Sequence, residues 1–383
     1  MLIAVGEVLA VGEISAEEHL GWVKSRSSAS FLQTPAWGSV KDGWRAESIG
    51  WRRDGELVGA ALVLYRRVPA LARYLAYTPE GPLIDWSPPD LRAWLDPMRD
   101  YLHDRGAFAL RIGPPVVSRV WEAATVKQAL ADESHVRLGG VPPDELAPIG
   151  LRVEDALRAT GWQGPPAGSG FPAGQPRYVV QLPLAGESEE SLLARMSKQW
   201  RRNIKKAGTG ELVTREGSAA DLRGFHRIYL ETAQRNGFRP RSARYFATMY
   251  EALGREAGDR IGLHIAEHRG RPVAAMIRIK VGEHVWYAYG ASSNEGRELR
   301  GPNAVQWHGI CRALREGSRV YDLRGITDSV DPNCPSSGLL RFKLGTGGRV
   351  VGYVGEWTLP ISRPLYAAFD LFMRHRFRVA RDG

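Results

Sequence analysis

The chain has 383 residues, of which 43% are hydrophobic and 25% charged, a composition typical of a soluble globular protein with room for two domains. Lysine and arginine outnumber aspartate and glutamate by 52 to 42, and the net charge of +10 favours an anionic partner such as nucleic acid, phosphate or a membrane surface. The alternative is that this charge only confers solubility. Two cysteines, Cys311 and Cys334, do not indicate a disulfide framework and fit a reducing cytoplasm.

The N-terminal stretch, residues 1–15, lacks the basic leader of a signal peptide and carries Glu7. No apolar run reaches the length that spans a bilayer. We therefore expect a cytoplasmic protein, with peripheral contact to the inner face of the membrane as a further option.

Two segments of the chain repeat each other. Residues 51–65, WRRDGELVGAALVLY, align without a gap with residues 266–280, AEHRGRPVAAMIRIK, and each copy has a glycine where a hairpin would turn. The alternation of apolar residues on both sides of that glycine predicts a β-hairpin in each copy. Residues 74–77, YLAY, and residues 286–289, WYAY, then predict the next strand of each copy.

The two copies continue in the same order. Each next predicts a helix, a glycine suited to end it and one more strand, at residues 94–115 in the first copy and 305–326 in the second. Pro302 fits the opening turn of the second helix, where a missing N–H is tolerated. Four elements in one order indicate an internal duplication.

The repeated order resembles the architecture of the acyl-CoA N-acyltransferase (GNAT) family, here present twice. We therefore predict an α/β fold of two tandem GNAT-like domains, the first formed by residues 1–175 and completed by 356–383, the second by 176–355. The proline- and glycine-rich stretch 161–176 is expected to join them.

Two stretches concentrate positive charge. Residues 192–207, LLARMSKQWRRNIKKA, have apolar residues at helical spacing, which predicts one amphipathic helix whose basic face includes Lys198, Arg201, Arg202, Lys205 and Lys206. Their mutual repulsion favours a polyanion opposite that face, and a solvated basic face is the alternative. Residues 238–246, FRPRSARYF, offer arginine forks suited to phosphate. Neither stretch matches a DNA-reading motif, so DNA is not an expected partner.

The segment 337–357, SGLLRFKLGTGGRVVGYVGEW, places an aromatic and a lysine, Phe342 and Lys343, just before a run of glycines. Glycine lets a backbone approach another molecule closely, and lysine offers a charge with three donors. We expect this pair next to a glycine loop and at the edge of a cleft, following a strand at 321–326. The alternative is a solvated lysine on a hairpin.

Motifs for several other chemistries are absent. There is no G-x-S-x-G, H-E-x-x-H or Walker sequence, and the histidines do not fall at metal-ligand spacing with the cysteines, so we expect no metal. Residues 297–304, RELRGPNA, stand where a CoA-dependent acyltransferase needs its pyrophosphate loop. Glu298 and Asn303 replace the expected residues there and Pro302 lacks an N–H, so acetyl-CoA is a poor fit.

Together these features resemble the Fem family (FemX, FemA, FemB) of tRNA-dependent peptidyltransferases. The resemblance covers nearly the whole chain and is carried by residues 200–207, 286–292, 321–326 and 338–343 with the glycines that follow, and by 35–37, Lys41 and 74–82 in the first half. No long coiled-coil insertion interrupts the second half, which makes the chain more similar to FemX than to FemA.

The resemblance implies an aminoacyltransferase of peptidoglycan biosynthesis. Such an enzyme moves an amino acid, here expected to be glycine, from aminoacyl-tRNA to the side-chain amine of residue 3 of the precursor's stem peptide. The precursor would be lipid II or its UDP-linked form, and the product builds the interpeptide bridge. Aminoacyl-tRNA is a co-substrate, and no cofactor is implied.

The resemblance also implies roles for particular residues. The precursor's pyrophosphate and sugar would be held by Lys41, Arg241, Tyr245 and Tyr289. Phe342 and Lys343 would meet the aminoacyl end of the tRNA, and the basic helix would bind the tRNA itself.

The chain departs from the family pattern at one point. The first-domain strand usually ends in an acid, but here it reads Arg111-Ile112-Gly113-Pro114, so Gly113 removes a candidate precursor-binding carboxylate.

An aminoacyl ester is already activated, so its aminolysis needs positioning and stabilisation of the oxyanion more than a strong base. Lys343 is the candidate for the oxyanion. Asp322 and Asp328 are candidate proton acceptors, with a structural hydrogen bond as the alternative for each.

Three other functions are compatible with the sequence. A related enzyme could tailor a peptide natural product by the same chemistry. A CoA-dependent N-acetyltransferase and a non-catalytic RNA-binding module are the others.

The C-terminal residues 361–383 predict a helix that places Leu365, Phe369 and Phe372 on one face and ends in a basic tail of Arg374, Arg376 and Arg378. Such a helix could lie on an anionic membrane, and packing against the protein is the alternative.

Overall fold

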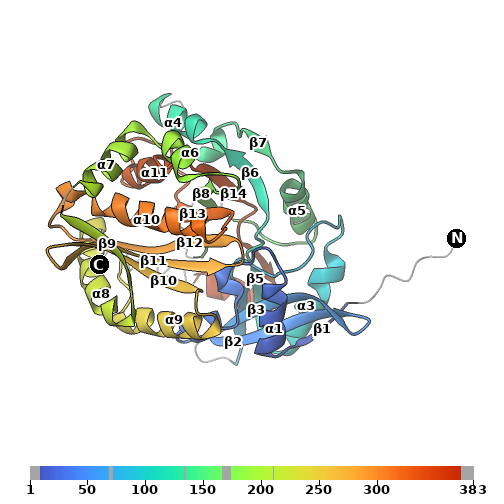
Figure 1. Cartoon of the computed structure of the whole chain (residues 1–383). Helices are drawn as coiled ribbons and strands as arrows, with labels where there is room; N and C mark the ends of the chain where they lie inside the picture. Colours follow the sequence, from blue (N-terminus) through green and yellow to red (C-terminus); the bar gives the residue numbers. More distant parts are fainter. Residues whose placement is uncertain (1–8, 69–71, 133–134, 166–173, 210, 372–383) are drawn as a thin grey trace.

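The computed structural model describes residues 9–68, 72–132, 135–165, 174–209 and 211–371. Within these ranges the chain forms two twisted sheets covered by helices (Figure 1). The first sheet has the spatial order β1 (Ala10–Glu13), β2 (Arg45–Arg53), β3 (Glu56–Arg67), β4 (Tyr74–Thr78), β5 (Ala107–Ile112) and β15 (Trp357–Pro360). The second has the order β7 (Glu145–Leu146), β6 (Val117–Trp121), β14 (Arg349–Tyr353), β8 (Tyr178–Pro183), β13 (Val320–Ile326), β12 (His284–Ser292), β11 (Arg271–Val281), β10 (Ile261–His268) and β9 (Leu212–Gly217).

The repeated order predicted from the sequence is confirmed. Both halves contain an antiparallel hairpin, a third strand, a helix and a strand parallel to the third, namely β2-β3-β4-α3-β5 and β10-β11-β12-α10-β13. The helices α3 (Arg92–Asp104) and α10 (Gly301–Arg315) are each followed within two residues by a glycine of positive φ, Gly106 and Gly317. Both halves also open with a strand and two helices, α1 (Ala16–Lys24) and α2 (Trp37–Val40) in the first, α8 (Leu222–Asn236) and α9 (Ala243–Glu256) in the second.

The two sheets do not divide at residue 175. Strands β6 and β7, with α4 (Ala123–Asp132) and α5 (Pro148–Ala159) between and after them, come from the first 175 residues, yet β6 pairs with β14 in the second sheet. Strand β15, from the C-terminal segment, pairs with β5 in the first sheet. The expected linker 161–176 falls partly outside the described residues.

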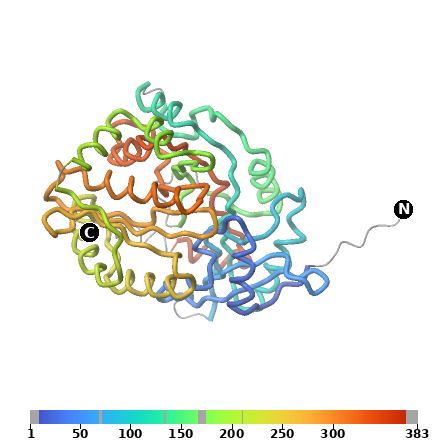
Figure 2. The backbone as a smooth tube through the Cα atoms, viewed as in Figure 1, coloured from blue at the N-terminus to red at the C-terminus, as the bar shows by residue number. Residues whose placement is uncertain are grey.

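One apolar cluster joins the two halves. It contains Phe31, Trp37 and Leu62 from the first half together with Phe246 and Trp286 from the second. Because this core is continuous, the two halves pack directly against each other and are not connected by the linker alone (Figure 2). The opposite face of the second sheet is covered by α10 together with α7 (Lys198–Gly208) and α11 (Ser337–Leu344), and its core includes Trp200, Tyr321 and Leu344.

The basic stretch 192–207 forms two helices and not the single one predicted. Helix α6 (Glu189–Arg195) ends at Met196, whose backbone is extended, and α7 (Lys198–Gly208) begins after it. The hydroxyl of Ser197 accepts a hydrogen bond from the N–H of Trp200, so this serine caps the second helix.

Phe342 and Lys343 lie near the end of a helix, α11 (Ser337–Leu344), which was not predicted from the sequence, and the glycines follow directly after it. The glycines after them face the chain's own backbone and side chains. A methyl group at Gly345 would lie 2.2 Å from Cδ1 of Trp200, and one at Gly347 would lie 2.9 Å from the carbonyl oxygen of Arg195. Glycine is therefore required here for α11 to pack closely against α6 and α7.

The C-terminal segment is helical from residue 363 to 371, and Leu365 and Phe369 pack against the first sheet. The ring of Phe369 meets that of Phe108 edge to face at 5.4 Å. This part of the expected membrane-facing surface is thus covered by protein, while Phe372, Arg374, Arg376 and Arg378 lie outside the described residues. Among the helices in the described ranges, none combines the length and apolar character needed to cross a membrane.

The close contact at Gly345 is testable. Gly345→Ala should destabilise the protein by about 1–3 kcal/mol, because the added methyl group forces the ring of Trp200 out of place. Gly338→Ala, in the same helix, has no atom within 4 Å of its new methyl group and should be neutral or stabilising by up to about 1 kcal/mol. Urea unfolding of both variants measures the difference, and equal midpoints would contradict the packing argument.

Candidate functional site

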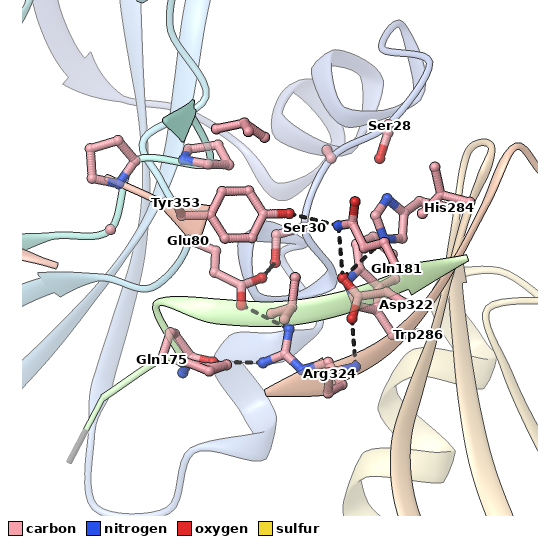
Figure 3. A pocket seen from close by; sticks show the side chains of 18 of the residues that line it. Ser28, Ser30, Glu80, Gln175, Gln181, His284, Trp286, Asp322, Arg324 and Tyr353 are labelled. Carbon is pink, nitrogen blue, oxygen red and sulfur yellow. Dashed lines mark hydrogen bonds and ion pairs between the residues drawn. The ribbon is translucent and has the colours of Figure 1, made fainter. Parts of the chain in front are cut away.

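A cavity of about 300 Å³ lies between the two halves. The first half contributes the loop at Ser28–Ser30, Glu80 and Gly113, and the second contributes side chains from β8, β12, β13 and β14 (Figure 3). Alternate residues of a strand point to the same face, so Asp322 and Arg324 of β13 both face the cavity, while Tyr321 and Leu323, which alternate with them, enter the core on the other side.

An ion pair crosses the cavity from one half to the other. The guanidinium of Arg324 donates to Glu80 at 2.8 Å and to the side-chain oxygen of Gln175 at 2.8 Å, and Ser30 donates to Glu80 at 2.5 Å. Arg324 and Glu80 both have positive φ, 62° and 49°, a conformation that costs free energy in residues other than glycine. Backbone strain of this kind gathers at functional sites, where the surrounding structure maintains it.

Asp322 forms the centre of a polar network on the cavity wall. It is 1% exposed, accepts a hydrogen bond from the Gln181 amide at 3.0 Å and another from the backbone N–H of Arg324 at 2.6 Å, and lies 3.4 Å from Nε2 of His284. Burial works against ionisation, but the neighbouring His284 and the charge of Arg324 lower the pKa of Asp322. Asp322 is therefore a buried anion that accepts two hydrogen bonds and faces His284.

A carboxylate stands beside the glycine that replaces the family's acid. The side chain of Glu356 passes 3.6 Å from the position that a methyl group on Gly113 would take. Glu356 accepts hydrogen bonds from the Tyr77 hydroxyl and from the backbone N–H of Gln175, and burial raises its pKa. Sequence reasoning missed this residue, although an acid inside the apolar run 350–359 was a usable signal.

The four residues expected to bind the precursor come together from three elements. Lys41 follows α2, Arg241 comes just before the N-cap of α9, Tyr245 lies in the first turn of that helix, and Tyr289 lies on β12. The hydroxyls of Tyr245 and Tyr289 are 2.8 Å apart, and the guanidinium of Arg241 lies 5.2 Å from the ring of Tyr245. Burial and the charge of Arg241 lower the pKa of Lys41, and the charge of Glu356 acts in the opposite direction, which places this group near the cavity.

Lys343 is buried, with 4% of its surface exposed, and is not at the edge of a cleft as expected. Its ammonium nitrogen donates to the carbonyl oxygens of Gly325 at 2.7 Å and Arg324 at 3.2 Å. Burial lowers the pKa of Lys343 to about 7, so near neutral pH this side chain exchanges between the charged and neutral forms.

The basic helix is attached directly to the helix of Lys343. The Trp200 indole donates to the carbonyl oxygen of Phe342 at 2.8 Å, and the two rings lie 4.9 Å apart. Trp200 is buried, whereas the five cations expected to contact tRNA are all exposed on α7: Lys198, Arg201, Arg202, Lys205 and Lys206. The second sheet thus separates a cationic surface on one side from the cavity on the other, and Lys343 reaches β13 between them.

Comparison with known proteins identifies similar chains. The model of the FemAB family matches residues 14–269 and 262–374. Lipid II:glycine glycyltransferase of Staphylococcus aureus strain MRSA252 is 24% identical, with 93% of this chain and 94% of that protein covered, and the protein of strain USA300 is 25% identical over the same shares.

Two solved structures are similar in fold. The crystal structure of FemX has a TM-score of 0.78 at 21% identity and covers 94% of this chain and 99% of that one. A tandem GNAT protein from the clavulanic acid biosynthesis pathway has a TM-score of 0.52 at 13% identity, covering 92% and 99%. The chain therefore has the predicted fold of two GNAT-like domains.

The buried Lys343 should leave a signature in the stability of the protein. In the folded chain it releases its proton near pH 7, whereas in the unfolded chain it holds the proton up to its ordinary value of 10.5. Between these values the unfolded state binds the extra proton, so this residue makes the wild type more stable as the pH rises. Relative to Lys343→Met, the urea midpoint of the wild type should rise from pH 7 to 10. A constant difference would show that Lys343 is charged when folded.

Proposed function

The chain belongs to the FemAB family and is a transferase, and we propose that it moves an amino acid from aminoacyl-tRNA to the side-chain amine of residue 3 of the stem peptide of lipid II. Glycine is the proposed residue, because the S. aureus relatives are named glycine transferases. The observation that carries the proposal is the position of Lys343, which connects an exposed basic helix on one face of the second sheet with a polar cavity on the other.

The acceptor side is the cavity and the cluster beside it. Lys41 and Arg241 present two cations to a pyrophosphate, and the paired hydroxyls of Tyr245 and Tyr289 can hydrogen-bond a sugar. The adjoining cavity of about 300 Å³ then receives part of the stem peptide.

The donor side is the surface of α7 and α11. The exposed cations of α7 attract the phosphates of the tRNA acceptor arm. Phe342 is half-buried against Trp200, and its remaining edge is available for the terminal nucleotide. Aromatic stacking on a base contributes about 1–3 kcal/mol.

The chemistry is aminolysis of an ester. The acceptor nitrogen attacks the ester carbonyl carbon, a C–N bond forms, and the C–O bond to the ribose breaks. Holding the two reactants together can contribute about 7–11 kcal/mol. Charged Lys343 would stabilise the oxyanion of the tetrahedral intermediate, a contribution of about 3–4 kcal/mol for one donor.

Incubation of labelled glycyl-, alanyl- and seryl-tRNA with lipid II and with its UDP-linked precursor tests the proposal. Mass spectrometry of the product identifies donor and acceptor together. A parallel arm with acetyl-CoA in place of the tRNA tests the alternative of an N-acetyltransferase. Acetylation of the acceptor without transfer from any tRNA would overturn the proposal.

Lys343→Met should abolish transfer, with a loss of at least about 10²-fold in kcat, because the oxyanion loses its donor. The protein should remain folded, as judged by its circular dichroism. Urea unfolding of the same variant across the pH range separates folding from activity. Turnover at the wild-type rate would remove Lys343 from the mechanism.

Charge reversal on the basic helix should weaken the use of tRNA. Arg201→Glu with Lys205→Glu, four residues apart on α7, should raise KM for aminoacyl-tRNA and reduce the slope of log KM against log salt by about 0.7–0.9 for each phosphate that the helix no longer neutralises. Arg223→Glu with Arg227→Glu has the same spacing and exposure on α8 and serves as the matched control. An equal effect of both pairs would indicate that only net charge matters.

A further inference from the structure

His284 is the cavity residue whose polar atoms are not accounted for by the fold. It lies at the first position of β12, is 9% exposed and lines the cavity (Figure 3). Its Nε2 atom is buried without a hydrogen-bond partner, although Asp322 Oδ2 is only 3.4 Å away. A buried polar group left in this condition calls for a functional explanation, because satisfied groups are the rule in protein interiors.

The ring of His284 is held in one orientation. It stacks on Trp286 with ring centroids 4.0 Å apart and planes 15° apart. The carboxylate that it faces is itself fixed by the Gln181 amide and the backbone N–H of Arg324. With Nε2 directed at Asp322, Nδ1 is the ring nitrogen left for a molecule in the cavity.

The proposed reaction needs a proton acceptor at this place. A side-chain amine has a pKa near 10.4 in water, so it arrives as an ammonium ion with no lone pair for attack. The other carboxylates of the cavity are already engaged, because Glu80 holds Arg324 and Ser30, and Glu356 accepts from Tyr77 and Gln175. Asp322 is 1% exposed, accepts hydrogen bonds from Gln181 and from the N–H of Arg324, and turns Oδ2 toward Nε2 of His284, so little of it is accessible to a bound ligand.

On the basis of the proposed function, we infer that His284 is the proton acceptor for the acceptor ammonium and that Asp322 positions it. Nδ1 takes one proton from the ammonium, and the freed lone pair attacks the ester carbon. The second proton of that nitrogen passes to the departing ribose oxygen as the C–O bond breaks, so the atoms balance. Once protonated, His284 carries a hydrogen on Nε2, which Asp322 is placed to accept, and the imidazolium is stabilised.

The arrangement connects the acceptor side to the donor side. Asp322 accepts the N–H of Arg324, and Lys343 donates to the carbonyl oxygen of the same residue on the other side of the strand. The other titratable groups near His284 and Asp322 are those of the cavity wall, with Lys343 behind it: Glu80, Arg324, Tyr353, Glu356 and Lys343.

The test compares two acceptors that differ in one property. One is lipid II with its natural side-chain amine, and the other is an analogue in which an aminooxy group, unprotonated near neutral pH, replaces that amine. His284→Gln keeps a side-chain amide to face Asp322 but cannot accept a proton. It should lower kcat/KM with the amine by about 10²–10⁴-fold and remove the acidic limb of its pH profile, while leaving transfer to the aminooxy analogue near the wild-type rate.

The control is His308→Gln, a histidine of α10 in the same half that pairs with His264 away from the cavity, and it should behave as wild type with both acceptors. Added imidazole should restore part of the activity of His284→Ala, as expected when a missing proton acceptor is supplied. Equal losses of His284→Gln on the amine and the aminooxy acceptor would make His284 structural and overturn the inference, as would full activity on the amine. Wild-type protein that transfers to neither acceptor overturns the proposed function itself.

Discussion

The site depends on the separation of two parallel strands in the second sheet. Strands β12 and β13 pair only from His284 to Trp286 and from Val320 to Asp322, although both continue for several residues. Beyond that point β13 shifts its register with β8, and Arg324 takes a left-handed conformation. Backbone groups that a regular ladder would satisfy then need other partners.

Lys343 provides such a partner, and its burial in that position determines its pKa. It donates to the carbonyl oxygens of Arg324 and Gly325, two backbone groups at the point where the strands separate. Because it is buried to do this, its pKa falls to about 7. The lysine that we propose for catalysis thus also completes the hydrogen bonding of β13.

The features that could be predicted were those that depend on short stretches of sequence. Hairpins, helix ends and their repetition follow from alternation and from glycines such as Gly106 and Gly317, so the duplicated fold was accessible from the sequence. The helix of Lys343 was missed because α11 spans only 8 residues and begins Ser-Gly, which weakens its periodic signal. Ser197, a residue type favoured as an N-cap, marks the break between α6 and α7 in the sequence. The break was missed because the helical spacing of apolar residues continues across it.

The residues that line the cavity could not be predicted, because they lie far apart in the sequence and belong to no common motif. Glu80, Gln175, His284 and Glu356 come from separate segments and meet only because both halves share one core. The departure at Gly113 illustrates the limit. The sequence shows a glycine at the end of β5 where the family resemblance leads us to expect an acid, and only the fold shows that the side chain of Glu356, from a distant segment, lies beside that position.

The duplication also allows the parallel strands of the two halves to be compared directly. In the first sheet, β4 pairs with β5 along its whole length, from Tyr74 to Thr78, so its parallel strands leave no opening. In the second sheet the equivalent strands part after three pairs. The cavity is lined by β12 and β13 of the second half, so the reaction that we propose is placed beside this separation. The first half contributes Glu80 and the Ser28–Ser30 loop to the cavity wall, and the ion pair of Glu80 with Arg324, two residues of positive φ, joins that wall to β13.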